Sequence, residues 1–311
     1  MAKTINIFSR ILERLQLRSE GQASSPVEEN RIHATAEAVA LPEAVVPLEA
    51  LVPPQAVDPF FLCSGAGNLF AIKTIVDESE APTREEIIQI CTQRAVEGVL
   101  FLRKLEEQNF KWHFFNRDGS SAEFCGNAAR CAQAFLRQSV GVHEFTHHTQ
   151  AGKIKTWSEG EKHWVQMPDP KILSDKLTVS VDSQNFLGFW CDTGVPHFVT
   201  SQRNYRYDLW KQISQKLRNA PDFTERGANI TWIGVPTAGR PLQAVTYERG
   251  VEDFTQACGT GAMAAALYLK NKWPQQSVFE IKMPGGILTV KEVAEVWQMT
   301  GPFEKIQKSG G

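Results

Sequence analysis

Residues 125–134 read CGNAARCAQA, and residues 258–267 read CGTGAMAAAL. Each stretch opens with Cys-Gly and continues as an alanine-rich run. Because alanine is the strongest helix former, each stretch predicts a helix that begins at its Cys-Gly pair. The first amides of a helix have no partner within it and carry the positive end of its dipole, so a cysteine there should have a lowered pKa. The amides beside it can hold a carboxylate.

The two stretches lie far apart in the chain and match in context, which indicates an internal duplication. Short apolar runs separated by turn residues precede and follow each predicted helix. We therefore expect two halves of one fold that face each other, with Cys125 and Cys258 on opposite sides of one bound substrate. The alternative is that both are buried structural cysteines, which is a common fate of this residue type.

The composition is that of a globular protein long enough for two domains. The 311 residues are 42% apolar and 22% charged, and a formal net charge of −2 gives no electrostatic reason to expect a nucleic-acid partner. No apolar run approaches the ~20 residues that span a bilayer. Six cysteines in a chain without a recognisable export signal are expected to be thiols, which predicts a cytoplasmic location.

The first 58 residues are expected to lie outside the folded unit. Residues 3–18 have near-helical apolar spacing, which leaves open a short amphipathic helix or a loosely ordered extension, and the extension is favoured. Residues 19–58 are rich in Pro, Ala and Glu and predict a linker. The Gly-x-Gly at 65–67 lacks the third glycine and the following helix of a dinucleotide site, so we reject that site.

Further elements follow from periodicity and turn residues. We predict helices over 83–93, with Thr83 and Glu86 as a capping box, and over 207–217. A turn is predicted over 192–197. The predicted strands cover 60–64, 69–76, 98–105, 111–116, 142–148, 153–158, 162–167, 177–181, 186–191, 229–234, 242–248, 278–282, 287–293 and 295–300, the last of which is expected to end the fold.

Several short motifs occur in a specific order. They are GAGN at 65–68, FNRDGS at 115–120 leading into the first cysteine, TGVPH at 193–197, RGAN at 226–229, and ERG at 248–250 leading into ACGTG at 257–261. Together, over about residues 60–303, they resemble the diaminopimelate epimerase family of cofactor-independent amino-acid epimerases.

The resemblance implies a fold and a division of the chain. The fold is α/β (α+β), with two similar domains, each a curled, mostly antiparallel sheet or barrel around a central helix, and the active site in the cleft between them. The first domain would comprise 59–173 plus 297–311, and the second 174–296. The final strand would return to the first domain.

Inverting an amino-acid α-carbon without pyridoxal phosphate requires one base to remove a proton and one acid to return a proton to the opposite face. By resemblance, Cys125 is the proton donor and Cys258 the acceptor in one direction. The implied reaction interconverts LL- and meso-2,6-diaminopimelate, for lysine and peptidoglycan precursors. No cofactor or metal is implied, and a homodimer is one assembly that the resemblance leaves open.

The remaining candidate residues would bind the substrate. The first amides of both predicted helices can stabilise the charge that develops on the α-carboxylate, and an arginine fork can hold a second carboxylate. The alternatives are helix capping for the glycines, turn formation for the asparagines and an exposed charge pair for 248–249. The candidates for the α-carboxylate are Gly126, Asn127, Gly259 and Thr260. By resemblance, the distal end is held by Arg249, Asn116 and Asn229, and Asn68 lies nearer the reacting centre. Glu248 is a candidate for binding an ammonium, and His197 for a supporting role.

Three positions depart from the family pattern. Leu69 stands where the family usually has Asp, Ala128 where it usually has Gly, and Val195 where many members have Asn. Leu69 and Val195 leave open a sibling racemase that acts on another amino acid, such as histidine or a proline derivative. A further alternative is a non-catalytic paralogue that binds amino acids.

The other cysteines and a histidine group are expected to be structural. Cys131 lies about 240° round the helix from Cys125 and should pack in the core, as should Cys63, Cys91 and Cys191. The histidines at 143, 147 and 148 lack the ligand spacing of a metal site, and a solvated strand or loop is expected there. Two thiols that flank one small substrate should also be joined by an oxidant, which would stop catalysis.

Overall fold

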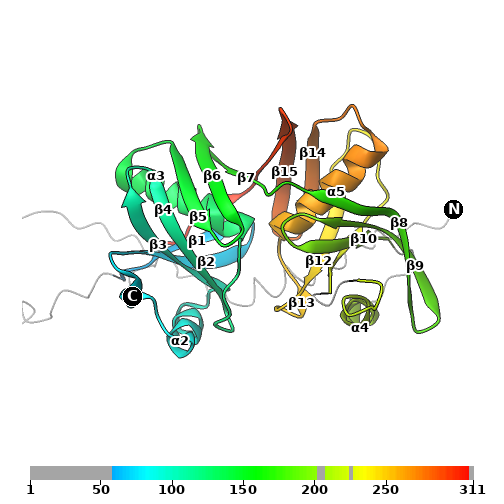
Figure 1. Ribbon diagram of the computed structural model, residues 1–311, viewed down its shortest axis with the longest axis horizontal. Coiled ribbons are helices and arrows are strands. Elements are labelled where there is room, and N and C mark those ends of the chain that lie inside the picture. Colours follow the sequence, from blue (N-terminus) through cyan, green and yellow to red (C-terminus); the bar gives the residue numbers. More distant parts are fainter. Residues whose placement is uncertain (1–57, 202–206, 224–226, 308–311) are drawn as a thin grey trace, which may run out of the picture.

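The computed structural model describes residues 58–201, 207–223 and 227–307. Residues 3–18, expected to form a loosely ordered extension with a short amphipathic helix as the alternative, lie outside the described residues, as do nearly all of the predicted linker and Arg226 of the RGAN motif. Within them, two sheet-rich halves lie side by side, and each half wraps around one central helix (Figure 1). None of the described helices is long and apolar enough to cross a membrane.

The first half is built on hairpins and parallel pairs. A 3-10 turn over Glu78–Glu80 precedes α2, whose capping box joins Thr83 and Glu86 as predicted. The elements, in order, are β1 (Phe61–Gly65), β2 (Asn68–Ile75), α2 (Arg84–Arg94), β3 (Gly98–Glu106), β4 (Asn109–Asn116), α3 (Gly126–Val140), β5 (Glu144–Thr149), β6 (Gly152–Glu159) and β7 (Lys162–Gln166).

The second half repeats this sequence of elements after one long strand. The elements from here to the end of the described chain are β8 (Lys171–Val181), β9 (Gln184–Asp192), β10 (Pro196–Thr200), α4 (Tyr207–Leu217), β11 (Asn229–Ile233), β12 (Leu242–Glu248), β13 (Asp253–Phe254), α5 (Gly259–Lys272), β14 (Val278–Met283), β15 (Gly286–Val293), β16 (Val296–Thr300) and β17 (Phe303–Lys305), the last of which belongs to the first half by its pairing with β1.

The strand pairings establish the duplication. In the first half, β2 and β3 are parallel partners on either side of α2, and β4 and β5 are parallel partners on either side of α3. In the second half, β10 and β11 pair in the same way around α4, and β12 and β14 around α5. The α/β fold with two repeated halves is therefore confirmed.

The end of the chain ties the halves together. Strand β16 pairs with β15 of the second half and with β7 of the first, and β17 pairs with β1. The chain thus returns to the first half, as the resemblance implied. One hydrophobic core cluster includes residues from both α3 and α5, so the halves are packed against each other rather than loosely linked.

The two cysteine helices occupy the centres of the halves, and their first residues meet. A Cβ built on Gly259 would lie 3.6 Å from the Cα of Gly126. Both glycines also lie against one side chain, because a Cβ on Gly126 or on Gly259 would come within 2.8 or 2.9 Å of the Met299 Cε. Only glycine fits at these positions without displacing Met299, and this lets the two helix starts approach closely.

Three expectations about the elements are wrong. Strand β10 occupies part of the predicted turn, because its five residues are mostly buried and show no alternation that would mark a strand. The strand ending at Thr300 is not the last, since β17 follows after Pro302 and pairs with β1. The histidine cluster is not solvated throughout: His147 on β5 is fully buried and bonds Thr156.

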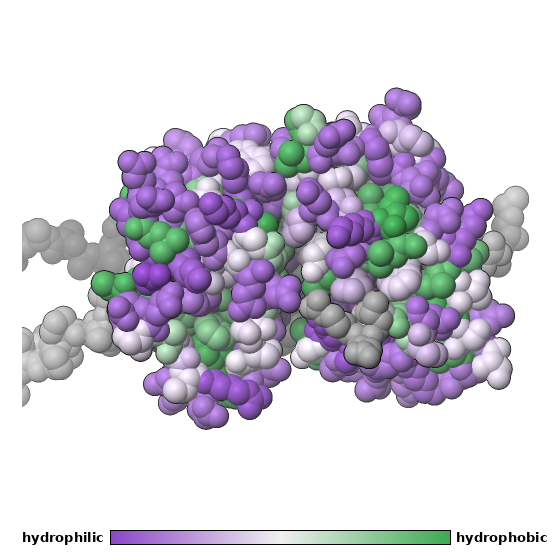
Figure 2. Space-filling model, in the orientation of Figure 1, coloured by the Kyte–Doolittle hydropathy of each residue, from purple (hydrophilic) through white to green (hydrophobic). Residues whose placement is uncertain are grey.

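Figure 2 shows a surface that is mostly hydrophilic on this face, with hydrophobic residues in small, separated groups. The exposed large hydrophobic side chains are distributed over many elements, from Val76 after β2 to Val296 on β16. Scattered groups of this kind are ordinary for protein surfaces.

Candidate active site

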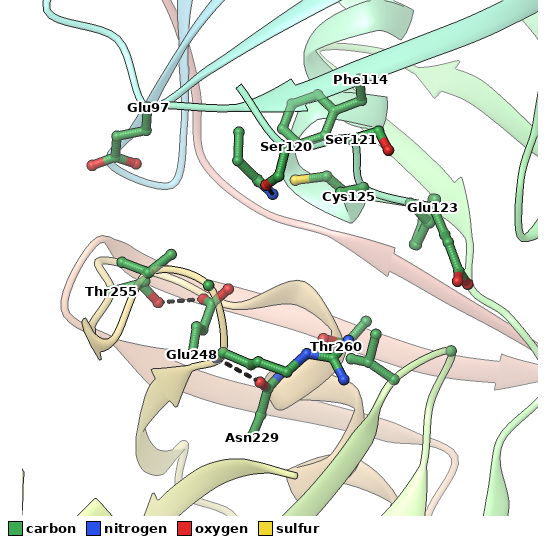
Figure 3. Close-up of a pocket in the computed structure, with 18 of the residues that line it drawn as sticks. Glu97, Phe114, Ser120, Ser121, Glu123, Cys125, Asn229, Glu248, Thr255 and Thr260 are labelled. Atoms are coloured by element: carbon green, nitrogen blue, oxygen red, sulfur yellow. Dashed lines mark hydrogen bonds between the residues drawn. The ribbon is translucent and has the colours of Figure 1, made fainter. Parts of the chain in front are cut away.

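A cavity of about 480 Å³ lies between the two halves, which is in the usual range for a small-molecule site. Figure 3 shows its two walls, with Cys125 on one side and Glu248, Thr255 and Asn229 on the other. Its polar and charged lining residues are Asn68, Glu97, Asn116, Ser120, Ser121, Glu123, Gln150, Asn229, Glu248, Arg249, Thr255 and Thr260; Val195, Phe70 and Phe114 are among the apolar ones.

Each candidate catalytic cysteine is the N-cap of its helix. Cys125 precedes α3 in extended conformation, is half-buried and lines the cavity. Cys258 precedes α5 and is buried, and its sulfur accepts a hydrogen bond from the Gly261 amide at 3.3 Å. The Thr260 hydroxyl, which lines the cavity, lies 3.3 Å from the same sulfur. Thr260 therefore contacts the Cys258 thiol and lines the cavity, whereas Cys258 itself is not among the lining residues.

The expected lowering of the thiol pKa values is wrong for this pocket. Burial raises the pKa of Cys125 to about 12, although the amides of Ala128 and Asn127 act in the opposite direction. Burial also raises the pKa of Cys258 above its ordinary value, and the Glu248 carboxylate raises both. The helix-start amides are present as predicted, but the loss of hydration outweighs them.

A polar network holds the second wall of the cavity. The Asn229 side-chain oxygen accepts a hydrogen bond from the Arg249 amide at 2.9 Å, and its nitrogen lies 3.3 Å from the His197 Nε2. His197 also contacts the Thr260 hydroxyl at 2.9 Å. Burial lowers the pKa of His197 to about 3, with a further contribution from Arg249, so the imidazole is neutral near pH 7.

Glu248 is held by the loop that leads to Cys258. The Thr255 hydroxyl donates a 2.5 Å hydrogen bond to its carboxylate, and the Cys258 thiol lies within hydrogen-bonding reach of the same group. Burial raises the pKa of Glu248. A substrate ammonium would compensate this partly buried carboxylate, since a charge that loses hydration is stable only when paired.

Two asparagines of the first half reach across to the second cysteine. The Asn68 and Asn127 amide groups both donate to the Ala257 carbonyl, at 2.7 and 2.9 Å. Ala257 immediately precedes Cys258, so these bonds fix where the second helix begins relative to the first half. The Asn68 Oδ1 is buried and has no hydrogen-bond partner among the described residues, which leaves an acceptor for a substrate N–H group.

The structure brings most of the predicted residues to one cavity. Asn68, Asn116, Cys125, Asn229, Glu248, Arg249 and Thr260 line it. The other predicted residues do not line it but adjoin residues that do. Gly126 follows Cys125 and Gly259 precedes Thr260 in the chain, and the Cys258 sulfur and His197 contact the Thr260 hydroxyl. Asn127 shares the Ala257 carbonyl with Asn68. Cys131 is fully buried in the core, and the three remaining cysteines are buried as expected.

Sequence reasoning missed several lining residues. Glu97 comes from the start of the β3 segment, and Gln150 from the β5–β6 turn. Neither belongs to a recognisable motif, and only the fold brings them to the cavity. Ser120 lies within the quoted FNRDGS motif, four residues after Asn116, and Thr255 lies three residues before Cys258, so these hydroxyls could have drawn attention.

Comparison with known proteins agrees with this geometry. The family model described as diaminopimelate epimerase matches residues 60–173 and 189–306. The chain belongs to the diaminopimelate epimerase family. A diaminopimelate epimerase of Aquifex aeolicus is 33% identical over 268 residues, which cover 79% of this chain and 95% of the relative. One from Thermotoga maritima is 34% identical, over 74% of this chain and 92% of the relative.

Solved structures of other proteins share the fold of this chain at low sequence identity. A probable proline racemase from Agrobacterium radiobacter matches with a TM-score of 0.58 and 14% identity, over 79% of this chain and 90% of that one. A PhzC/PhzF phenazine biosynthesis protein from Clostridium difficile matches with a TM-score of 0.57 and 13% identity, over 80% and 96%. These similarities extend the two-half architecture beyond diaminopimelate epimerases.

Proposed function

We propose that the protein interconverts LL- and meso-2,6-diaminopimelate by proton transfer at one α-carbon, with Cys125 and Cys258 as the two acid–base groups. The observation that carries the proposal is the meeting of two cysteine-capped helix starts at one cavity. Each helix start offers free amides to a carboxylate, and each carries a thiol that can exchange one proton. A reaction that inverts one carbon needs a thiol and a set of free amides on each side of the substrate, and this pair of helix starts provides them.

The proton transfer uses the two thiols in opposite states. Cys258 as thiolate takes the α-proton and becomes a thiol, while the Cys125 thiol gives its proton to the opposite face and becomes a thiolate. The negative charge that develops on the α-carboxylate is stabilised by the Gly126, Asn127, Gly259 and Thr260 amides, with donors of this kind worth about 3 kcal/mol each. The reverse reaction exchanges the roles of the two thiols.

The buried thiols need a positive partner to ionise, and the substrate supplies one. Its α-ammonium would lie beside the thiolate and would also pair with the Glu248 carboxylate, whose negative charge otherwise raises the pKa of both thiols. Substrate binding would therefore lower the pKa values that burial raises. This makes the pocket reactive mainly when it is occupied.

Recognition of a second amino-acid end supports diaminopimelate over a simple amino acid. Arg249 lines the cavity and is positioned through its amide by Asn229. A guanidinium binds a carboxylate with two parallel hydrogen bonds. We assign the distal carboxylate to Arg249, with Asn116 and Asn229 nearby, and the acceptor of Asn68 to the reacting end.

The direct test is incubation with LL-diaminopimelate in deuterated water. The proposal predicts meso product that carries solvent deuterium at the inverted carbon. Cys125→Ala and Cys258→Ala should each abolish turnover, whereas Cys131→Ala should retain it, because Cys131 lies in the core and not at the cavity. Absence of both meso product and α-deuterium would refute this substrate.

One departure from the family pattern favours an alternative substrate, another amino acid in place of diaminopimelate. Val195 lines the cavity and places an apolar side chain where many members have an amide. Leu69, in contrast, packs with the cluster around α2, away from the cavity wall. A sibling racemase of another amino acid is thus favoured only by Val195. A panel of amino acids in deuterated water separates the two: exchange with another amino acid and none with diaminopimelate would favour the sibling.

The remaining expectations about organisation are part of the proposal. We assign 59–173 plus 297–311 to the first domain and 174–296 to the second, a division that follows the repeated order of elements. We further propose a homodimer, a cytoplasmic location and catalysis without a cofactor. Sedimentation of the purified protein tests the dimer, and retained turnover after dialysis against a chelator tests the absence of a required metal.

A further inference from the structure

Arg130 carries a positive charge in the core that no carboxylate neutralises. Its side chain is 0% exposed, and no ion pair joins it to an acidic residue within the described residues. An arginine keeps its charge in proteins, and burying an unpaired charge is costly unless strong hydrogen bonds compensate. The hydrogen bonds of Arg130 must therefore compensate for the burial of its charge, and they indicate what the residue does.

Those bonds converge on two segments, the connection between β16 and β17 and the start of α3. One guanidinium nitrogen donates to the Gly301 and Pro302 carbonyls at 2.8 and 2.9 Å. These residues connect β16 to β17, where the chain returns to the first half. The other terminal nitrogen donates to the Asn127 Oδ1 at 2.9 Å.

The bond to Asn127 determines which way its amide group points. Because the oxygen of Asn127 faces the guanidinium, the nitrogen must face the other way, and it donates to the Ala257 carbonyl. Without Arg130, the amide could rotate and lose this bond. Ala257 lies beside Cys258, so a guanidinium on the first cysteine helix is linked through Asn127 to the peptide that precedes the second cysteine.

We propose that Arg130 is a positioning residue for the epimerase reaction, which acts through Asn127 on the Ala257 carbonyl and thereby sets where the Cys258 thiol lies relative to the Cys125 thiol. The proposal rests on the proposed function, in which both thiols act on one carbon. Arg130 touches no substrate in this account. Asn68 shares the Ala257 carbonyl and gives a second, independent tether.

The test uses variants that break the relay at different points. Arg130→Lys keeps the charge but cannot supply the fork, and Arg130→Met removes both. Asn127→Asp keeps an acceptor for Arg130 but has no N–H to donate to Ala257. The matched control is Arg137→Met on the same helix, which loses a guanidinium bond to the Gly160 carbonyl but has no link to the second cysteine.

Two readouts do not depend on the substrate. The first is amide hydrogen exchange over residues 255–258, and the second is alkylation of Cys258, which is 5% exposed. We expect both to accelerate about tenfold in Arg130→Met and in Asn127→Asp, as for the loss of one buried hydrogen bond. The double variant should accelerate no further, because both changes break one relay. Arg137→Met should match the parent protein.

Turnover then links the relay to catalysis. We expect kcat to fall in Arg130→Lys and Asn127→Asp with little change in KM, since the tether positions a thiol and leaves Arg249 and Glu248 in place. Unchanged exchange and alkylation in Asn127→Asp, or additive effects in the double variant, would overturn the inference. If Arg130→Met fails to fold, Asn127→Asp decides the question alone. If the variants alter exchange and alkylation but the parent protein does not turn over diaminopimelate, the relay is supported and the proposed substrate is refuted.

Discussion

Gly261 gives a quantitative test of how the second cysteine is held. It is the third residue of α5, and its amide donates to the Cys258 sulfur. A Cβ at this position would lie 2.3 Å from the Thr246 Oγ1, and 3.2 Å from both the Thr231 Oγ1 and the Cys258 Cβ. The first distance is far inside normal contact, so Gly261→Ala must displace Thr246 or the start of α5.

The expected magnitude follows from opposing effects. Alanine gains up to roughly 1 kcal/mol over glycine within a helix. Overpacking costs about 1–3 kcal/mol, and displacing Thr246 also disturbs its 3.1 Å hydrogen bond with Thr231, which is worth about 1 kcal/mol. We expect a net loss of about 1–3 kcal/mol, or a fall in Tm of roughly 2–6 °C for a protein of this size.

A double-mutant cycle identifies the cause. Thr246→Ala removes the hydroxyl that the new methyl group would meet, so the combined variant should be more stable than the sum of the single changes by about 1 kcal/mol or more. Denaturation followed by fluorescence gives the free energies, and deuterium incorporation into substrate gives the activity. We expect the combined variant to recover part of the activity that Gly261→Ala loses. A neutral Gly261→Ala, or additive effects in the combined variant, would refute the reasoning.

Three further predictions concern the cavity. Glu248→Gln should lower the pKa of both thiols, because its carboxylate adds to burial in raising them; the midpoint of thiol alkylation against pH should move down, and an unchanged or higher midpoint would contradict this. Mild peroxide should join Cys125 to Cys258 and stop turnover until a reductant is added; peptide mapping that finds no such link in a still-active enzyme would discard the idea. A chain that starts at residue 58 should retain turnover, because every residue lining the cavity lies between 68 and 260; loss of turnover with an unchanged Tm would argue against this.

Local features of this fold could be predicted from the sequence. The capping box of α2 depends on residues three apart, and each cysteine helix depends on one short stretch. The sequence predicted only that the two halves are similar. The structure shows in what respect, because a pair of parallel strands flanks each of the four helices. Strand β10 could not be predicted because burial on both faces removes the alternation that identifies a strand.

The sequence could predict which residues form the site, but not their burial, their pKa values or their contacts with distant segments. The motifs identified Cys125, Cys258 and Arg249, whose chemistry is local to the side chain. The raised thiol pKa values could not be predicted, because they arise from burial by segments distant in the sequence. The same holds for Glu97 and for the bond from Asn127 to Ala257, which joins residues 130 positions apart.

The central claim is that two thiols act on opposite faces of one carbon, and early turnover in deuterated water tests it most directly. With LL-diaminopimelate as the starting epimer, the first meso molecules should carry deuterium at the inverted carbon, while the remaining LL pool stays protonated at low conversion. This follows because the base that removes the proton differs from the acid that delivers one. Deuterium appearing equally in both epimers at low conversion, or meso product that retains the original proton, would contradict the account.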